Sequence, residues 1–214
     1  DRTTVEQRIL QHAAFGHARL AIVDPEHGQQ PFASADGQLV VTFNGEIYNY
    51  VELRDELRAL GHAFRTTSDT EVLVTGYREW GRGVLDRIDG MFAFALYDRR
   101  GGELFCARDP YGQKPFFYRV DGARFAFTSE CRTFAELPGF RAELDLASLA
   151  DFLAFESLPF DRSIYREIAV AYYERERARI VSDNARRANT LPAVLADDVL
   201  DDLVESGVTI LLTT

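Results

Sequence analysis

The stretch MFAFALYD, residues 91–98, is apolar at every position except the last. In an extended strand its side chains alternate between two faces, with Phe92, Phe94 and Leu96 on one and Met91, Ala93, Ala95 and Tyr97 on the other. A strand with two apolar faces is buried on both sides and lies inside a layered structure. The sequence therefore predicts a sheet that is covered on both sides, by helices or by a second sheet.

Further extended segments surround this strand along the chain. They fall at residues 13–23, 38–43, 103–109, 115–120 and 124–129. Their close succession after residue 91 is typical of antiparallel strands that are joined by tight turns. We expect the strands at 91–98 and 124–129 to lie at the interface between two sheets, with four phenylalanines mostly buried: Phe92, Phe94, Phe125 and Phe127.

Three helices are predicted from apolar spacing and capping residues. The first carries leucines at helical spacing: Leu53, Leu57 and Leu60. The second begins at Ser68, which forms a capping-box pair with Glu71. The third covers about residues 145–155 and is capped by Asp145. Its apolar residues are expected to face inward: Leu149, Phe152 and Leu153.

The composition changes after about residue 165. Arginine and glutamate dominate residues 172–190, a short acidic helix is predicted at 195–203, and 208–212 is a candidate buried strand. One helix and one strand are too few to make a domain. We therefore expect a first domain at 1–165, and a linker with the beginning of a second, truncated α/β domain at 166–214.

Composition and charge narrow the function classes. The 214 residues are 46% hydrophobic, enough for one substantial core, and their formal net charge is −10. Nucleic-acid binding requires positive charge to neutralise phosphates, so this balance argues against it. No apolar run approaches the ~18 residues of a membrane span, and we expect a soluble, cytoplasmic protein. Cys106 and Cys131 lie too far apart for a zinc-knuckle spacing, and no metal site is expected.

The segment Asn44-Gly45-Glu46 follows a predicted strand and precedes a predicted helix. An Asn-Gly pair in this place is first of all a turn signal. It also has the chemistry of an oxyanion site, because glycine lets its backbone N–H approach a ligand closely and the asparagine amide supplies a second donor. Glu46 would add a carboxylate that suits an ammonium group. The pattern alone leaves both interpretations open.

Two other charged residues also have a structural and a functional interpretation. Arg19 lies in a predicted strand, as a solvated or ion-paired side chain or as a bidentate fork for a substrate carboxylate. Asp69 lies in the first turn of a helix, where its carboxylate either favours the helix dipole or faces an amino group in a pocket. Together, Arg19, Glu46 and Asp69 could clamp an α-amino acid.

Six blocks occur along the chain in a fixed order: FGHARLAIVD (15–24), NGEIYNY (44–50), TTSDTEV (66–72), DGMFAFALYD (89–98), ARDPYGQKPFFY (107–118) and Ser129-Glu130. As a series they resemble the class II glutamine amidotransferase domain, in its asparagine synthetase branch. NGEIYN and the block with Asp109-Pro110 are the most specific. The resemblance covers about residues 13–165.

The resemblance implies an α+β fold of the N-terminal-nucleophile type, a four-layer α/β/β/α sandwich of two antiparallel sheets, followed by part of an α/β synthetase domain. It also implies that Arg19 holds the carboxylate of glutamine, that Glu46 and Asp69 hold its amino group, and that Asn44 and Gly45 form the oxyanion hole. The implied function is that of a glutamine-dependent asparagine synthetase, in which released ammonia amidates aspartate with the use of ATP.

Two stretches depart from the family. The family's nucleophile is an N-terminal cysteine whose own α-amine serves as the base, whereas residue 1 is Asp1 and neither Cys106 nor Cys131 carries a free α-amine. Residues 166–193 also lack the family's pattern. We therefore expect the 214-residue chain to be inactive by itself and to hold no cofactor, with ATP and Mg²⁺ bound by a full-length enzyme that forms a homodimer.

Two other functions fit the same motifs. An amide- or lactam-forming synthetase of a natural-product pathway would share this domain and differ in the domain that binds the acceptor. A non-catalytic amidotransferase-like module would keep the fold for binding alone. The intact recognition set argues against the second, because a decayed site has no physical need for it.

Overall fold

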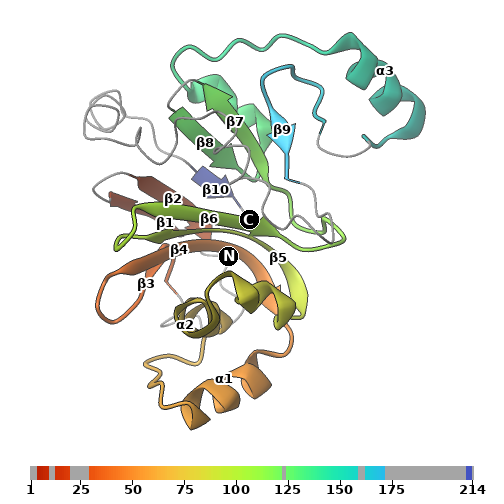
Figure 1. Ribbon diagram of the computed structural model, residues 1–214. Helices are drawn as coiled ribbons and strands as arrows, with labels where there is room; N and C mark the ends of the chain where they lie inside the picture. The colour runs from red at the N-terminus through yellow and green to blue at the C-terminus, as the bar shows by residue number, and fades with distance from the viewer. Residues whose placement is uncertain are drawn as a thin grey trace.

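The computed structural model describes residues 4–9, 13–19, 29–121, 124–158, 162–171 and 211–213 (Figure 1). Its strands are β1 (Thr4–Ile9), β2 (Ala14–Arg19), β3 (Phe32–Ala33), β4 (Leu39–Ile47), β5 (Gly90–Asp98), β6 (Glu103–Arg108), β7 (Phe117–Asp121), β8 (Arg124–Thr128), β9 (Ala169–Val170) and β10 (Leu211–Thr213). Its helices are α1 (Tyr50–Ala59), α2 (Asp69–Trp80), α3 (Leu146–Phe155) and the 3-10 helices η1 (Gly81–Asp86) and η2 (Cys131–Glu136).

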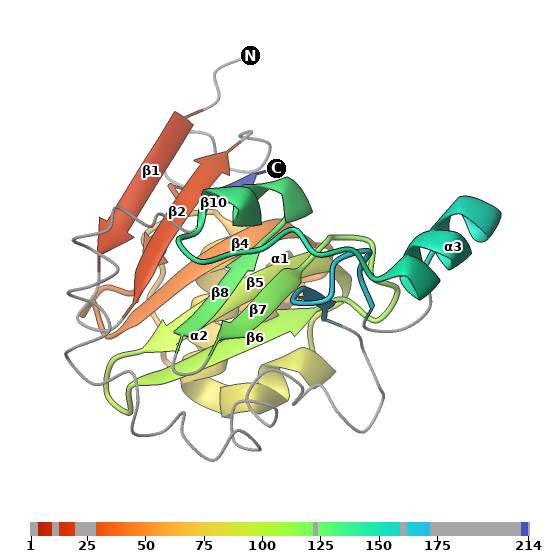
Figure 2. The same ribbon diagram turned by 90° about the horizontal axis from the view of Figure 1, so that it is seen from above.

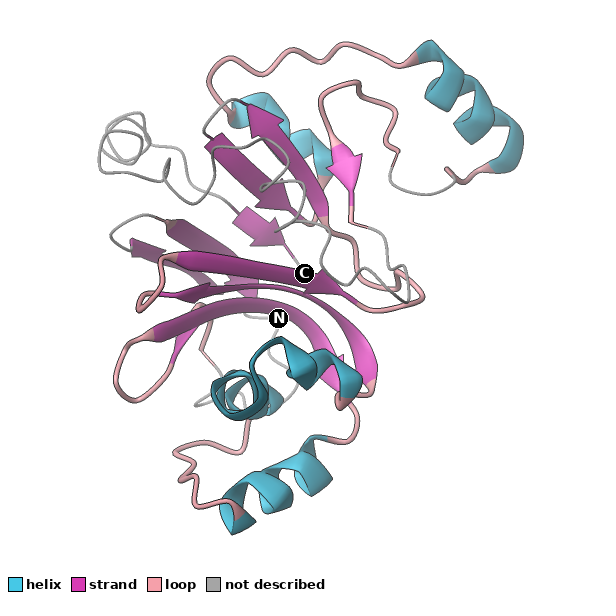
Figure 3. Ribbon diagram, viewed as in Figure 1, coloured by secondary structure: helices cyan, strands magenta, loops and turns pink. Residues whose placement is uncertain are grey.

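A four-stranded sheet in the order β3-β4-β5-β6 forms the middle of the molecule (Figure 3). Its neighbouring strands are antiparallel, and β4 and β5 pair along nine residues, from Leu39 opposite Asp98 to Ile47 opposite Gly90. Helices α1 and α2 cover one face of this sheet. The core between the sheet and the helices includes Phe43, Leu57, Leu73, Phe92 and Phe94.

The opposite face of the central sheet packs against β2, β7 and β8. Ala93, Ala95 and Tyr97 of β5 lie in a second core. That core also contains aromatic residues of the facing strands: Phe15, Phe116, Tyr118 and Phe127. Both faces of β5 are therefore buried, which confirms the layered structure that the two apolar faces of MFAFALYD predict.

The predicted burial of the phenylalanines in β5 and β8 is confirmed for three of the four, and the structure adds which layer covers each of them. Phe127 lies between the sheets and half-buried Phe125 packs beside it, as predicted. Phe92 and Phe94 are buried too, but they point toward the helices. Alternation along a strand tells which residues share a face, whereas it does not tell which layer covers that face. The large phenylalanines of β5 pack against the helices, and the small alanines on its opposite face allow the second sheet to pack closely.

Two three-stranded sheets complete the described structure. Strands β8, β7 and β9 are antiparallel, and the 3-10 helix η2 lies against β8 with Phe134 buried. Strand β2 pairs antiparallel with β1 and parallel with β10. Stacked antiparallel sheets with helices on their outer side confirm the predicted α+β class.

Helix α3 stands away from the three sheets (Figures 1 and 2). Asp145 caps it as predicted, because its side chain accepts a hydrogen bond from the backbone N–H of Ala147 at 3.1 Å. The predicted inward apolar face is wrong: Phe152 and Leu153 are exposed, and the buried residue is Ser148. The reason is that, within the part of the chain that the structure describes, no sheet lies beneath the face of this projecting helix that carries them.

The predictions for the C-terminal part fall largely outside the described residues. Residues 172–210, which include the predicted acidic helix at 195–203, are not described. Of the predicted strand at 208–212, only the last two residues are described, within β10. The domain boundary at 165 therefore stays a prediction. No helix of the described part is both long and apolar enough to cross a bilayer.

Candidate active site

The end of strand β4 carries the segment that sequence analysis leaves open between a turn and an oxyanion site. Asn44, Gly45 and Glu46 are not a turn: they lie inside β4, opposite Ala93, Phe92 and Met91 of β5. The local turn preference of Asn-Gly is overridden because the strand continues to pair with β5 beyond residue 43. The strand ends at Ile47, three residues before α1 begins.

Gly45 has a backbone conformation that requires glycine. Its φ is +143°, and a Cβ built there would lie 2.0 Å from the carbonyl oxygen of Met91. Gly90 is similarly crowded, since its Cβ would lie 2.2 Å from the carbonyl oxygen of Glu46. The two glycines let β4 and β5 approach closely at this end of the sheet. Close backbone approach is also what a ligand requires in order to reach a backbone N–H.

Asn44 offers its side-chain amide beside this glycine. The residue is 4% exposed. Among the described residues its amide has no hydrogen-bond partner, although a buried amide normally has one. An amide donor next to a glycine backbone is the donor pair that an oxyanion hole needs.

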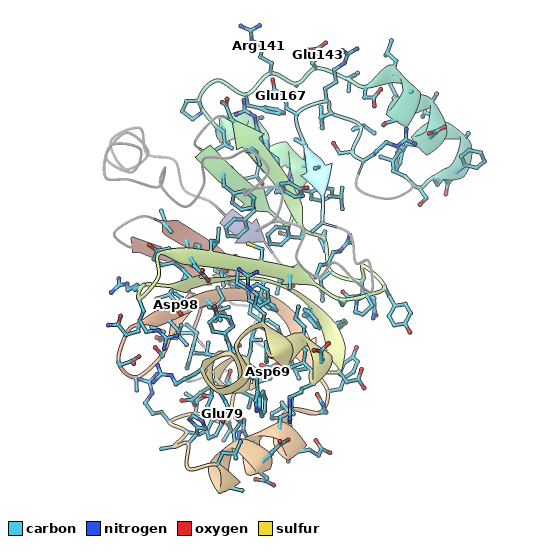
Figure 4. All side chains as sticks on the ribbon, in the orientation of Figure 1. Asp69, Glu79, Asp98, Arg141, Glu143 and Glu167 are labelled. Atoms are coloured by element: carbon cyan, nitrogen blue, oxygen red, sulfur yellow. The ribbon has the colours of Figure 1, made fainter. Side chains whose placement is uncertain are left out.

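Asp69 lies next to this strand end, as the first residue of α2 (Figure 4). One carboxylate oxygen, Oδ2, accepts the backbone N–H of Ile47 at 3.1 Å, and Oδ1 accepts the backbone N–H of Thr70 at 2.8 Å. Burial is the main cause that raises the pKa of the Asp69 carboxyl, and the nearby charge of Glu46 raises it further. The charge of Glu46 therefore acts on the Asp69 carboxyl, although the two residues lie on different elements, β4 and α2.

This pair of carboxylates has no cation of its own in the described structure. Neither Glu46 nor Asp69 has an ion-pair partner within the described ranges. The charge of Glu46 is one of the causes that raise the pKa of Asp69, so a cation near the two residues would lower that pKa. The geometry thus suits an ammonium group.

Arg19 is the remaining predicted site residue. Its backbone ends strand β2 and pairs with Thr4 of β1. Its side chain lies outside the described residues, so its approach to Glu46 and Asp69 stays a prediction.

The turn before α2 is fixed by two buried charged residues, Glu71 and Arg54, and sequence analysis assigned no role to Arg54. Ser68 is the N-cap as predicted. The predicted capping-box partner, Glu71, reaches further back and accepts the backbone N–H groups of Arg65 and Thr66. Arg54 of α1 donates to the carbonyl oxygens of Thr67 and Ser68 from the other side. In sequence, Arg54 is indistinguishable from a solvated arginine on an amphipathic helix.

Asp109 holds the loop that follows β6, at the same end of the sheet as Gly45. Its fully buried carboxylate accepts four backbone N–H groups, those of Phe92, Tyr111, Gln113 and Lys114. In turn, its own N–H donates to the carbonyl oxygen of Phe92, the residue opposite Gly45. The block ARDPYGQKPFFY therefore supports the strand that backs the candidate oxyanion site.

Comparison with known proteins agrees with this geometry. Residues 3–184 match the family model described as a glutamine amidotransferase domain. The chain is 46% identical over 142 residues to asparagine synthetase [glutamine-hydrolyzing] 3 of Bacillus subtilis, which covers 65% of this chain and 23% of the relative. It is 43% identical to a putative asparagine synthetase [glutamine-hydrolyzing] of Mycobacterium bovis, over 72% of this chain and 25% of the relative.

A plant relative is matched over a similar segment. Asparagine synthetase [glutamine-hydrolyzing] 2 of Oryza sativa is 41% identical over 60% of this chain and 23% of its own length. The chain spans about a quarter of the length of these relatives. The family match, in contrast, covers most of the chain, and the chain therefore belongs to the glutamine amidotransferase domain family.

Proposed function

We propose that this chain is the glutamine-recognition part of a glutamine-hydrolysing asparagine synthetase. The observation that carries the proposal is the pair of carboxylates, Glu46 and Asp69, beside the donors Asn44 and Gly45 at one end of β4. Glutamine has an ammonium group for the first pair and an amide carbonyl for the second. The family match and the printed names of the relatives support the same substrate.

The proposed roles follow from the charges of the substrate. Glu46 and Asp69 bind the α-ammonium group, and Arg19 binds the α-carboxylate through its guanidinium fork. The side-chain amide of Asn44 and the backbone N–H of Gly45 donate to the carbonyl oxygen as it becomes an oxyanion. These donors stabilise an attack that another group must make.

The thiols of this chain are poor candidates for that attack. Burial raises the pKa of the Cys106 thiol far above neutral pH, and it raises the pKa of Cys131 to about 11. Both are protonated at neutral pH, and the thiolate is the nucleophilic form. A cysteine nucleophile would therefore have to come from outside these 214 residues.

The remaining steps are proposals for the whole protein. Ammonia from glutamine would amidate aspartate after activation by ATP with Mg²⁺, in a cytoplasmic and dimeric enzyme. The described residues contain no group of three or more His, Cys, Asp and Glu that could hold a metal ion.

Substitution of Arg19 in the full-length protein tests the proposal. Arg19→Ala should abolish glutamine-dependent synthesis, because the substrate carboxylate loses its partner, and should leave ammonia-dependent synthesis largely intact. The matched control is Arg58→Ala, which removes a solvent-exposed arginine that pairs with exposed Asp55 and lies over the ring of Phe64, and it should affect neither rate. Equal loss of both activities in Arg19→Ala would show that Arg19 has a structural role and would count against the proposal.

A further inference from the structure

Gln30 continues the pairing of β3 with β4 by means of its side chain. Strand β3 pairs with β4 at only two positions, Phe32 opposite Val41 and Ala33 opposite Val40. The same register, continued by two residues, would place residue 30 opposite Phe43. The backbone is no longer a strand at residue 30, but the side-chain carbonyl oxygen of Gln30 accepts the backbone N–H of Phe43 at 3.2 Å.

The other end of the same amide reaches helix α2. The side-chain N–H of Gln30 donates to the hydroxyl oxygen of Thr70 at 3.0 Å. Gln30 and Thr70 are both 3% exposed, so water does not compete for these hydrogen bonds. One buried side chain therefore connects the strand of the oxyanion donors with the helix of the amino-binding carboxylate.

The two partners of Gln30 flank the two halves of the candidate site. Phe43 precedes Asn44 in β4, and Thr70 follows Asp69 in α2. The direct bond between these elements, from the Ile47 N–H to Asp69, uses the carboxylate that the substrate itself needs. The bridge through Gln30 uses neutral groups and leaves that carboxylate free for a ligand.

We propose that Gln30 is a positioning residue that fixes the spacing between the oxyanion donors and the carboxylate pair. This inference rests on the proposed function. In glutamine, two methylene groups separate the α-carbon from the amide carbon, so a site that hydrolyses it must hold its two halves at a matching distance. A loss of about 1 Å in alignment is enough to lower a rate substantially while binding is retained.

A side chain with both a donor and an acceptor is required for this bridge. A primary amide accepts from the Phe43 N–H and donates to the Thr70 hydroxyl at once. Methionine has a similar length and neither capacity. Glutamate keeps the acceptor but would place a charge in a buried, uncompensated position. The residue type at position 30 is thus explained by its two partners.

Kinetics of the full-length protein test the inference. Gln30→Met should lower kcat with glutamine on the order of tenfold and leave KM for glutamine within about twofold, because the head-group contacts remain while the carbonyl is misaligned. The rate with ammonia should not change. Thr70→Val, which removes one bond of the bridge and keeps the shape, should act in the same direction, and Thr70→Ser should restore the wild-type rate.

Matched controls separate positioning from stability. Ser148→Ala removes a buried hydroxyl that donates to Asp145 at 2.8 Å in α3, and it should lower the melting temperature without changing kcat with glutamine. The double variant Gln30→Met with Thr70→Val should lose no more rate than Gln30→Met alone, because both remove the same bridge.

Each outcome of these kinetic experiments either supports or overturns the positioning role of Gln30. An unchanged kcat in Gln30→Met, or an equal loss with glutamine and with ammonia, would overturn the positioning role and leave the proposed function standing. If Gln30→Met does not fold, Thr70→Val and Thr70→Ser decide by the same comparison. A wild-type protein that releases no glutamate from glutamine would instead overturn the proposed function, and the inference with it.

Discussion

Replacement of Gly45 by alanine tests the close approach of β4 and β5 at the candidate oxyanion site. The new methyl group would lie 2.0 Å from the carbonyl oxygen of Met91 and 2.7 Å from the Cα atom of Phe92. Both atoms belong to the backbone of β5, which is itself held by β6. Neither atom can move aside without disturbing the sheet, and the φ of +143° is unfavourable for alanine in any case.

The two effects have separate magnitudes. A positive φ costs a residue with a Cβ roughly 1–2 kcal/mol. Forcing an extra carbon into a packed region costs about 1–3 kcal/mol. The free energy of unfolding should therefore fall by roughly 2–5 kcal/mol, which for a domain of this size corresponds to a decrease in Tm on the order of ten degrees.

Three other glycines provide controls that separate strain from clash. Gly83 has neither a positive φ nor an atom close to the position of a Cβ, so Gly83→Ala should leave the free energy of unfolding nearly unchanged. Gly37 has a φ of +69° in open space, so Gly37→Ala should show the conformational cost alone. Gly90 has a clash of 2.2 Å without a positive φ, so Gly90→Ala should show the steric cost alone. Thermal unfolding of the four alanine variants, followed by circular dichroism, gives the comparison.

The expected order of stability follows from this series. Gly45→Ala should be the least stable variant, with a loss near the sum of the losses in Gly37→Ala and Gly90→Ala. A loss in Gly45→Ala that does not exceed that in Gly37→Ala would refute the close approach of the two strands. The glutamine-dependent rate of the full-length protein should also fall in Gly45→Ala, because the backbone N–H of residue 45 would shift.

Further predictions concern the carboxylate, the core and the thiols. Burial raises the pKa of Asp69, and only the ionised form attracts an ammonium group, so KM for glutamine should begin to rise, as the pH is lowered, at a higher pH than an ordinary aspartate would give. In Asp69→Asn the rise of KM at low pH should disappear, because residue 69 no longer titrates. At neutral pH the KM of this variant for glutamine should be higher than that of the wild type by roughly ten- to a hundredfold. The same raised pKa means that this carboxylate favours the unliganded fold at low pH and loses that contribution as the pH rises through it. Phe94→Ala should lower the free energy of unfolding by about 3–5 kcal/mol, because Phe94 is fully buried. Phe125→Ala should lower it by about half as much, because Phe125 is half-buried. Equal losses in the two variants, measured by chemical denaturation, would contradict the assignment of the cores. The 214-residue chain should release no glutamate from glutamine above the buffer rate, and turnover that survives in Cys106→Ala and Cys131→Ala would show that the nucleophile has been misassigned.

Much of the fold could be predicted because its signals are local. The two apolar faces of β5 predict burial on both sides, and Ser68 and Asp145 mark the starts of α2 and α3. What failed depends on distant partners. Asn44-Gly45 has the local preference of a turn, and only its pairing with β5 reveals a strand. The exposed apolar residues of α3 have helical spacing, which cannot show that no sheet of the described structure lies beneath them.

The charged residues of the candidate site could be predicted from the sequence, whereas the buried residues that hold its strand and helix in place could not. Glu46 and Asp69 carry the chemistry of amino-group binding, and the charge of Glu46 acts on the Asp69 carboxyl in the structure, whereas their shared role in binding stays a prediction. Gln30 and Arg54 were not predicted, because a glutamine in a loop and an arginine on an amphipathic helix are usually solvated. Their roles arise from burial and from partners on other elements, which a linear pattern does not contain.

The position of strand β5 determines how slowly its backbone hydrogens exchange with the solvent. Its neighbours β4 and β6 occupy both of its edges, and its two faces belong to two different cores. No partial opening that frees one core alone can release the backbone hydrogens of Ala93 to Tyr97 to the solvent. These hydrogens should be among the last to exchange with deuterium, at the rate of global unfolding. The oxyanion donors of β4 therefore pair with the strand whose backbone hydrogens exchange most slowly. Residues at the edge of the sheet can adjust to a ligand many times between two global unfolding events.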